Sequence, residues 1–549
     1  MVRGSGELTY IKSIKYINMK FRLLLAVLPL LVLVFACDED ILDQPNLNEY
    51  DATSYFASPP QLNEAVVAQY STLLLQGMYS RDYYFMFDLL GNDAQPGDAL
   101  LGDLRALATY QHGPQNPQVN QMWEALYRIS LRSNFALERI DDYEVQLGEQ
   151  DLIDQYRGES LFFRGYAYGH LARLWGDVPY RGSYDDHLTF NTARTPVDQV
   201  WENVEADLTA AIDLLPDSYD GANAGRATSN AARALLGRYH LWQGDFEAAR
   251  TVLEPLGPGG MHSYSLVENF DDQFSETNSQ TSETVFDINH VWTSWGEGNK
   301  YYMFGGQEGW GGVTTHTGRS QEYGFNDWNN VTVALGLVRA FTYEDQDGDT
   351  YVDPRAAFTF YGDAASGGDT DFCANDNRGG DPSRPRCEET QDYNFEANGY
   401  NWRKYNRYEY SAKEGEPDSE INTQIIRYAD VLLMLAEAQI ETGQVANGID
   451  VLNVVRERAG AFEYDGVTDQ NTARTIVRRE RQLELAGEQS RWFDLLRWFG
   501  ENAGQVLDAE EALEPGVGTA AFQPKMVRFP IPQGERDGNP LITVANDWN

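Results

Sequence analysis

Two distant segments of the chain share one layout, and this repetition constrains the fold more than any other feature. Residues 231–253 and 431–455 each carry a helix of mixed small and large apolar residues, a glycine at the turn, and a second helix. The two glycines are Gly244 and Gly443. Helix pairs of this kind bury their apolar faces only by packing side by side. The sequence therefore predicts a mainly helical scaffold.

Helical periodicity extends to other parts of the chain and supports this fold class. Apolar residues recur at helical spacing in residues 61–78, 121–143, 158–180, 194–216 and 473–499. In the third of these, apolar residues cover most of the circumference, so we expect that helix to lie between other helices. Before the fourth, Thr195 is the expected N-cap and Pro196 the first helical residue. We expect the tryptophans of the periodic helices to lie in the core: Trp123, Trp175, Trp242 and Trp498.

The N-terminal segment has the pattern of a secretory signal. Lys20 and Arg22 accompany a short apolar run that ends at Ala36, with Cys37 directly after it. The run is shorter than the roughly 20 residues that span a bilayer, although a membrane anchor or a buried helix is the alternative interpretation. A cysteine at this position is similar to a bacterial lipobox, in which it is lipidated and becomes the new N-terminus. We expect a signal peptide over residues 1–36, with Met19 as an alternative start, and a lipidated tether over residues 37–60.

The charge balance argues against nucleic acid as a partner. The formal net charge is −42, and the segment before Cys37 is itself basic, so the remaining chain is more acidic still. Such a surface repels phosphates, which bind to Lys and Arg. Acidic chains are often disordered, but 42% hydrophobic and 13% aromatic residues predict a folded domain here.

Between the two repeated segments, residues 255–423 lose helical periodicity. This region is rich in Gly, Asn, Asp, Trp and Tyr and is too long for an ordinary loop; long irregular segments are usually functional. We expect a single domain over residues 61–549. It should consist of a helical scaffold (61–254 and 424–500), a loop-rich ligand-binding region with short strands (about 255–423), and a C-terminal tail of strands and turns (501–549).

Five segments, in this order, resemble the SusD/RagB-type outer-membrane lipoproteins of Bacteroidetes-like bacteria: ESLFFRGYAYGHLARLWGDVPY, GRATSNAARALLGRYHLWQGDFEAA, IIRYADVLLMLAEA, RRERQLELAGEQSRWFDLLRW, and FPIPQ with the closing NPLI. The resemblance covers essentially the whole chain after Cys37. It implies a SusD-like α-superhelix with tetratricopeptide-like helix pairs. It also implies a lipid-anchored protein at the outer membrane that faces the cell exterior, and the acidic residues 38–40 resemble the signal for this location.

The same resemblance implies a partner and a ligand class. Family members act as lids on a SusC-like TonB-dependent transporter and deliver oligosaccharides, or peptides in the RagB-like members. A glycan site needs exposed aromatic rings flanked by carboxylates and amides. Two stretches expected to be loops combine these groups. The first has Asp82, Tyr83, Tyr84, Asp88, Asn92 and Asp93, and the second has Trp292, Trp295, Tyr301, Tyr302, Trp310 and Trp328. The alternative is that these aromatic residues form the core of an irregular subdomain.

Two further patterns concern a metal and a disulfide. Carboxylates alternate around a glycine at Asp345, Asp347, Asp349 and Asp353, which suits a structural calcium ion; an acidic turn is the alternative. Cys373 and Cys387 bracket a polar loop, and we expect them to form a disulfide. No other cofactor is implied.

Enzymatic and purely structural functions compete with binding. A helical-toroid glycoside hydrolase needs two suitably spaced carboxylates, but with 84 acidic residues such a pair arises by chance. A repeat scaffold alone would not need the aromatic-rich insert. The last predicted helix carries charges at helical spacing, which favours salt bridges over an active site: Glu480, Arg481, Glu484, Arg491, Asp494 and Arg497. We therefore expect a binding protein and not an enzyme.

Overall fold

The computed structural model describes residues 55–97, 100–261, 264–275, 280–290, 317–323, 330–362, 400–405, 419–511, 522–542 and 548. The chain divides into a unit up to Ala57 and a second unit from Ser58 onward, and the architecture below is that of the second unit. The predicted signal peptide, Cys37 and most of the tether lie outside the described residues. Within the described ranges, no helix is both long and apolar enough to cross a membrane.

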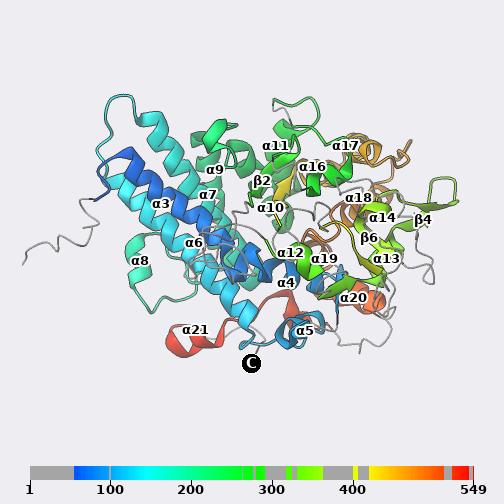
Figure 1. The fold of residues 1–549 in the computed structure, drawn as a ribbon, viewed down its shortest axis with the longest axis horizontal. Coiled ribbons are helices and arrows are strands. Elements are labelled where there is room, and N and C mark those ends of the chain that lie inside the picture. Colours follow the sequence, from blue (N-terminus) through cyan, green and yellow to red (C-terminus); the bar gives the residue numbers. More distant parts are fainter. Residues whose placement is uncertain are drawn as a thin grey trace, which may run out of the picture. The chain divides into compact units, whose positions relative to one another are not determined.

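The N-terminal half is built on four helices that pack side by side (Figure 1): α3 (Pro59–Ser71), α6 (Pro117–Asp142), α7 (Gln150–Trp175) and α9 (Val197–Leu214). All four were predicted from periodicity. The N-cap position before α9 is occupied by Pro196 and not by Thr195, so that boundary shifts by one residue. After α3 the chain forms the short 3-10 helix η2 (Thr72–Leu74) and the short π-helix η3 (Gln76–Ser80).

Helix α7 is buried around most of its circumference, as its sequence predicts. Its small residues allow its neighbours to approach closely: a Cβ atom on Gly169 would lie 2.2 Å from the ring of Tyr239, and one on Gly165 would lie 2.9 Å from Leu208. The helix ends at Gly176, whose φ of +75° requires glycine. The close packing therefore explains why glycines are used inside a long helix.

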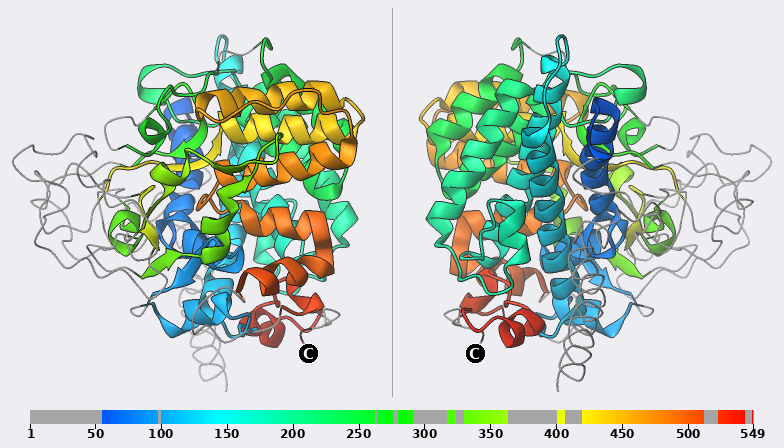
Figure 2. Two further views of the ribbon diagram at one scale, coloured as in Figure 1. Left: turned by 90° about the vertical axis from the view of Figure 1, so that its right-hand side faces the viewer. Right: turned by 90° about the vertical axis from the view of Figure 1, so that its left-hand side faces the viewer.

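The repeated segments form the predicted helix pairs. The first pair is α10 (Ser229–Gln243) with α11 (Phe246–Leu253), and the second is α16 (Tyr428–Glu441) with α17 (Val445–Arg458). Gly244 and Gly443 have φ values of +78° and +82° at the turns. Helix α11 packs on α16, so the two pairs are adjacent although the first ends at Leu253 and the second begins only at Tyr428. In Figure 2, α16, α17 and the following α18 lie side by side in yellow and orange.

The prediction of a single helix over residues 473–499 is wrong. The chain instead forms α18 (Gln470–Glu484) and α19 (Arg491–Phe499), separated by a turn over residues 485–490. Gly487 and Gln489 have positive φ values of 67° and 59° in this turn. A helix cannot continue through such residues, so the sequence pattern holds on both sides of the turn but not across it.

The described parts of the loop-rich region contain short strands in antiparallel pairs, as expected. The pairs are β1 (Ala94–Pro96) with β3 (Val331–Val333), β2 (Thr284–Ile288) with β8 (Thr423–Arg427), β4 (Thr342–Glu344) with β5 (Thr350–Val352), and β6 (Phe360–Gly362) with β7 (Tyr400–Trp402). Short helices lie between them: α12 (Arg319–Tyr323), α13 (Leu335–Ala340) and α14 (Ala356–Thr359). The described tail, predicted to contain strands, consists instead of η8 (Gly500–Asn502), α20 (Ala503–Glu511), η9 (Pro524–Val527), α21 (Gln533–Gly538) and irregular chain.

Candidate functional site

The first group of predicted ligand-binding residues does not lie in an exposed loop. Residues 82–90 form helix α4, and every residue of this helix is buried. Its sequence, DYYFMFDLL, is apolar on nearly all sides, which is the pattern of a helix enclosed by protein. The prediction of a loop is therefore wrong. Asp82, Tyr83, Tyr84, Asp88, Asn92 and Asp93 are all at most 6% exposed.

The carboxylates of this segment hold the 485–490 turn to the N-terminal half of the protein. Asp93 accepts a hydrogen bond from the backbone N–H of Gly487 at 3.0 Å, and Asp88 accepts one from the side-chain amide of Gln489 at 2.9 Å. Asp88 also pairs with Arg319 at 3.0 Å and accepts the hydroxyl of Tyr323 at 2.6 Å. These contacts are internal, so the residues that were predicted to bind ligand connect two halves of the fold.

Two of these carboxyls have strongly raised pKa values. Burial raises the pKa of Asp93 to about 8, and the nearby Asp88 adds to this shift. Burial also raises the pKa of Asp82 to about 7, although Arg81 opposes it. Both groups therefore carry a proton over much of the neutral range, which is how a buried carboxyl without an ion-pair partner avoids its charge.

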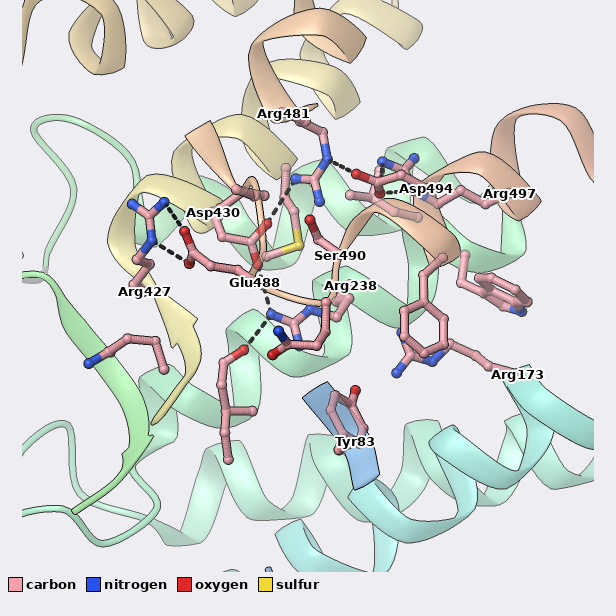
Figure 3. Close-up of a pocket in the computed structure, with 18 of the residues that line it drawn as sticks. Tyr83, Arg173, Arg238, Arg427, Asp430, Arg481, Glu488, Ser490, Asp494 and Arg497 are labelled. Carbon is pink, nitrogen blue, oxygen red and sulfur yellow. Dashed lines mark hydrogen bonds and ion pairs between the residues drawn. The ribbon is translucent and has the colours of Figure 1, made fainter. Parts of the chain in front are cut away.

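A polar cavity of about 60 Å³ lies where α4, α7, α10, α16 and α19 meet strand β8 and the 485–490 turn (Figure 3). Of the six residues predicted in the first group, only Tyr83 lines it. Five arginines line it, together with three carboxylates: Arg173, Arg238, Arg427, Arg481 and Arg497, with Asp430, Glu488 and Asp494. We call this space the central cavity.

Two ion-pair networks surround the central cavity. The smaller network joins Arg238, Arg481 and Arg497 to Asp430, Asp494 and Glu437, with the Arg481–Asp430 and Arg481–Asp494 distances both 2.8 Å. The larger network joins five basic residues to five acidic ones, namely Arg355, Lys404, Arg427, Arg456 and Arg458 to Glu283, Asp353, Glu480, Glu484 and Glu488. The prediction of structural salt bridges on 480–497 is thereby confirmed for Glu480, Arg481, Glu484, Asp494 and Arg497, while Arg491 pairs with Glu510 at 3.0 Å.

The arginines determine the charge of the buried acids. Burial alone would raise the pKa of Asp430, but Arg481 and Arg238 outweigh burial and lower it to about 2. In the same way, Arg458, Arg427 and Arg355 hold the pKa of Glu484 well below its usual value despite burial. These acids are therefore ionised across the physiological range.

The central cavity cannot accept an oligosaccharide. A volume of about 60 Å³ holds only a few water molecules, since each needs about 10–15 Å³ on this measure. Sequence reasoning missed most of its lining. One available signal was the arginine of the motif GHLARLW, because Arg173 lies among apolar residues near the end of its helix; another was the glycine at 487 in the final charged segment.

The predicted core tryptophans fall into two groups. Trp123 and Trp175 are buried, at 4% and 1% exposure, and their rings contact each other with centroids 5.1 Å apart. Trp242 and Trp498 are only partly buried, so the core prediction is wrong for them. Trp242 lines the central cavity, and the indole N–H of Trp498 donates to Glu437 at 2.8 Å.

A second, more open groove of about 140 Å³ combines aromatic and polar groups. Tyr219 and Tyr264 line it beside Gln280 and Asp287 of strand β2. Gln280 donates to Asp287 at 2.9 Å, and the hydroxyl of Tyr219 has no hydrogen-bond partner among the described residues. We call this space the side groove. Its mixture of tyrosines, amide and carboxylate is the chemistry that sugar hydroxyls and C–H faces require.

The second group of predicted ligand-binding residues lies outside the described residues, so its geometry stays a prediction: Trp292, Trp295, Tyr301, Tyr302, Trp310 and Trp328. The same holds for Cys37 and for the predicted disulfide between Cys373 and Cys387.

The predicted calcium ligands are not brought together. Asp345 lies in the turn between β4 and β5 and accepts the backbone N–H groups of Asp347 and Asp349, both at 3.0 Å. Asp353 is buried and forms an ion pair with Arg355 at 2.8 Å. Within the described ranges, no group of three or more His, Cys, Asp or Glu side chains is arranged to hold a metal. Among the described residues, the stretch is a turn capped by Asp345 and followed by the Asp353–Arg355 ion pair, and the calcium site stays a prediction.

Comparison with known proteins identifies the family. A sequence model of the SusD family matches residues 272–548, and a second model, described as starch-binding associating with outer membrane, matches residues 48–241. The first match spans half of the chain, and the chain belongs to the SusD family.

The relatives agree with this assignment over nearly the whole length. SusD-like protein P25 of Formosa agariphila is 26% identical over 97% of this chain and 99% of its own. The crystal structure of a SusD superfamily protein from Bacteroides vulgatus has a TM-score of 0.71, with 25% identity over 90% of this chain and all of that one. The surface glycan-binding protein A of Bacteroides fluxus, at 21% identity, shares the fold with a TM-score of 0.68 over 89% and 99% of the two chains. The mainly helical SusD-like fold predicted from sequence is thereby confirmed.

Proposed function

We propose that this protein is a non-catalytic binding protein that captures oligosaccharides at the outer membrane. Family membership carries the proposal: the N-terminal match is to a model described as starch-binding associating with outer membrane, and one protein of the same fold is a surface glycan-binding protein. The central cavity is too small for such a ligand. The ligand therefore binds at the surface of the irregular region.

The binding surface in this proposal consists of the aromatic residues in the segment 292–328. Aromatic rings stack on the C–H faces of sugars, and neighbouring amides and carboxylates bind the hydroxyls. The side groove supports the proposal because Tyr219, Tyr264, Gln280 and Asp287 offer the same chemistry within the described part of the chain. The side groove would hold one sugar residue of the ligand.

The proposed partner is a SusC-like TonB-dependent transporter, to which the protein passes its ligand while a lipid on Cys37 holds it at the membrane. The signal-like sequence before Cys37 and the family assignment support this arrangement. Co-expression with the TonB-dependent barrel of the same bacterium should co-purify a complex from detergent-solubilised outer membranes. A Cys37→Ala variant should move to the soluble fraction; normal membrane attachment of this variant would contradict lipidation.

A binding screen on the lipid-free protein tests the ligand class. Residues 38–549 are screened against glycans and peptides, and hits are measured by calorimetry. We expect a neutral glycan to bind without release of shorter products. The triple substitution of Trp292, Trp295 and Trp310 by alanine should abolish binding. Phe190→Ala is the matched control, because Phe190 is an aromatic residue that is 69% exposed on the helical scaffold. Peptide binding alone, or hydrolysis of the glycan, would contradict the proposal.

A further inference from the structure

Arg173 is a buried cation without an acidic partner. It lies in the last turn of α7, is 3% exposed, and lines the central cavity. Among the described residues it forms no ion pair, and its Nε–H has no hydrogen-bond acceptor. An arginine does not lose its proton in a protein, so its charge needs compensation from another source.

The two ion-pair networks do not supply this compensation. The smaller network contains three arginines and three carboxylates, and the larger contains five basic and five acidic residues. Each network is therefore neutral within itself. The three carboxylates that line the cavity, Asp430, Glu488 and Asp494, are each held by two basic side chains of their own network. Arg173 is the one positive charge left over at the cavity wall among the described residues.

The guanidinium of Arg173 faces aromatic rings and forms a side-chain hydrogen bond with Tyr83, while the backbone carbonyl of Arg173 accepts a hydrogen bond from Arg528 at 3.0 Å. The guanidinium carbon of Arg173 lies 4.1 Å from the ring centroid of Phe493 and 5.2 Å from that of Tyr239. These rings stabilise the cation through their faces and leave its edge toward the cavity. Burial raises the pKa of Tyr83, and burial lowers the pKa of His170 well below its usual value. Neither residue therefore carries charge at neutral pH, and neither balances the arginine.

We infer that the central cavity binds one small inorganic anion of the halide class, held by Arg173 together with Arg238. Arg238 lines the same cavity and keeps 21% of its side-chain surface accessible beside its pair with Asp430. The hydroxyl of Ser490 also lines the cavity and offers a further donor. The volume of about 60 Å³ admits a chloride or bromide ion with one or two waters but not a larger organic acid.

Bromide locates the site directly. Crystals of the lipid-free protein are grown in sodium bromide, and anomalous diffraction is measured at the bromine edge. We expect an anomalous peak in the central cavity next to the guanidinium of Arg173, where its N–H groups can make charge-assisted contacts with the anion. A cavity that contains only waters at high bromide concentration would overturn the inference.

A thermal titration shows whether the anion binds in solution. Chloride replaces gluconate at constant ionic strength, because gluconate is too large for the cavity while general screening stays the same. The wild-type Tm should rise by roughly 2–4 °C as chloride saturates the site, since an anion that binds only the folded state stabilises it. Arg173→Met should remove this rise.

Arg478→Met is the matched control. Arg478 also stacks on aromatic rings, 5.1 Å from Trp498 and 5.2 Å from Phe499, and it does not line the cavity. This variant should keep the chloride response of the wild type. An equal chloride response in Arg173→Met would overturn the inference. If Arg173→Met does not fold, Arg173→Lys keeps the charge and should keep the response, and the bromide crystals of the wild type decide the question alone.

Discussion

Two groups of buried acids contact the 485–490 turn or lie within it, and their pKa values are shifted in opposite directions. In the two ion-pair networks, eight carboxylates face eight basic residues, and the resolved pKa shifts of these carboxyls are downward, as for Asp430 and Glu484. The cluster around α4 contains four carboxyls, Asp82, Asp88, Asp93 and Glu322, and the described residues give it two ion pairs, Glu322 with Arg81 and Asp88 with Arg319. Burial raises the pKa of all four of these carboxyls.

The difference shows that the number of arginines per carboxylate, and not burial itself, decides the charge state. The acids compared here are buried, apart from the partly buried Glu488, so desolvation opposes ionisation in both groups. The carboxyls with lowered pKa values each interact with two or more basic side chains, which together outweigh desolvation. Asp88 and Glu322 each pair with a single arginine, and burial still raises their pKa values. The networks join the helix pairs through ion pairs, while Asp88 and Asp93 of the α4 cluster accept hydrogen bonds from the 485–490 turn.

The largest expected effect comes from Glu484→Gln. Glu484 pairs with Arg355 at 2.9 Å, with Arg427 at 2.6 Å and with Arg458. Its neutralisation leaves three buried arginines short of a partner, so the free energy of unfolding should fall by about 3–5 kcal/mol. Urea unfolding of the lipid-free protein followed by circular dichroism measures the loss.

Glu247→Gln is the control for this substitution. Glu247 pairs with Arg250 at 2.7 Å, but its side chain is 66% exposed. An exposed pair of this kind contributes about 0–1 kcal/mol. Equal losses in the two variants would show that the buried network does not stabilise the protein through its charges.

Asp93→Asn should stabilise the protein at high pH, in contrast to substitutions in the networks. The pKa of Asp93 is raised by burial to about 8 in the folded chain, against 3.8 when exposed. Between these values the folded state holds the proton and the unfolded state does not, so wild-type stability falls as the pH rises from about 4 to 8. Asparagine cannot ionise. The variant should therefore gain on the order of 3 kcal/mol relative to the wild type between pH 5 and pH 8.

Asp430→Asn should change the stability of the protein in the opposite direction to Asp93→Asn. The pKa of Asp430 lies at about 2 because Arg481 and Arg238 outweigh burial. Its contribution to stability is present above pH 4 and is lost only as the pH falls toward 2. This variant should be less stable than the wild type at both pH 5 and pH 8, as measured by urea unfolding at each pH. A destabilised Asp93→Asn at pH 8 would show that Asp93 is ionised and needed as a charge.

The sequence predicts structure that depends on local patterns, but not structure that depends on contacts between distant parts of the chain. The helices α3, α6, α7, α9 and both helix pairs follow from apolar periodicity, because a helix face that packs on a neighbour is visible in a short window. Helix α4 was missed because its polar residues find their partners far along the chain. Asp88 contacts Arg319, which is 231 residues away, and Gln489, which is 401 residues away. No local pattern reports whether a carboxylate will be paired.

Long-range contacts also explain the broken helix and the central cavity. The 485–490 turn is held by Asp88 and Asp93, so its left-handed residues are stabilised by a segment near the other end of the chain. Trp242 has the spacing of a core residue, but the cavity beside it exists only because α10, α19 and β8 come together around it. The predicted ligand-binding role of the 292–328 aromatic residues rests on composition and on the family, and it stays a prediction.

The smallest expected effect concerns Lys404, a basic residue of the larger network that can lose its proton near neutral pH. Burial lowers the pKa of Lys404 to about 8, against 10.5 in the exposed group, even though Glu488 opposes this shift. Between these values the unfolded chain binds the proton and the folded chain does not. This difference adds to wild-type stability as the pH rises, by about 1 kcal/mol between pH 8 and pH 9.

Lys404→Met should not show this gain. The free energy of unfolding of the wild type minus that of the variant should therefore increase by about 1 kcal/mol between pH 8 and pH 9. Urea unfolding at pH 7, 8 and 9 measures this difference. Because Arg427 also pairs with Glu488, at 2.7 Å, the carboxylate keeps a partner when Lys404 is neutral or absent. A difference that stays constant over this pH range would mean that Lys404 stays charged, and that the larger network behaves as a fixed set of charges like the smaller one.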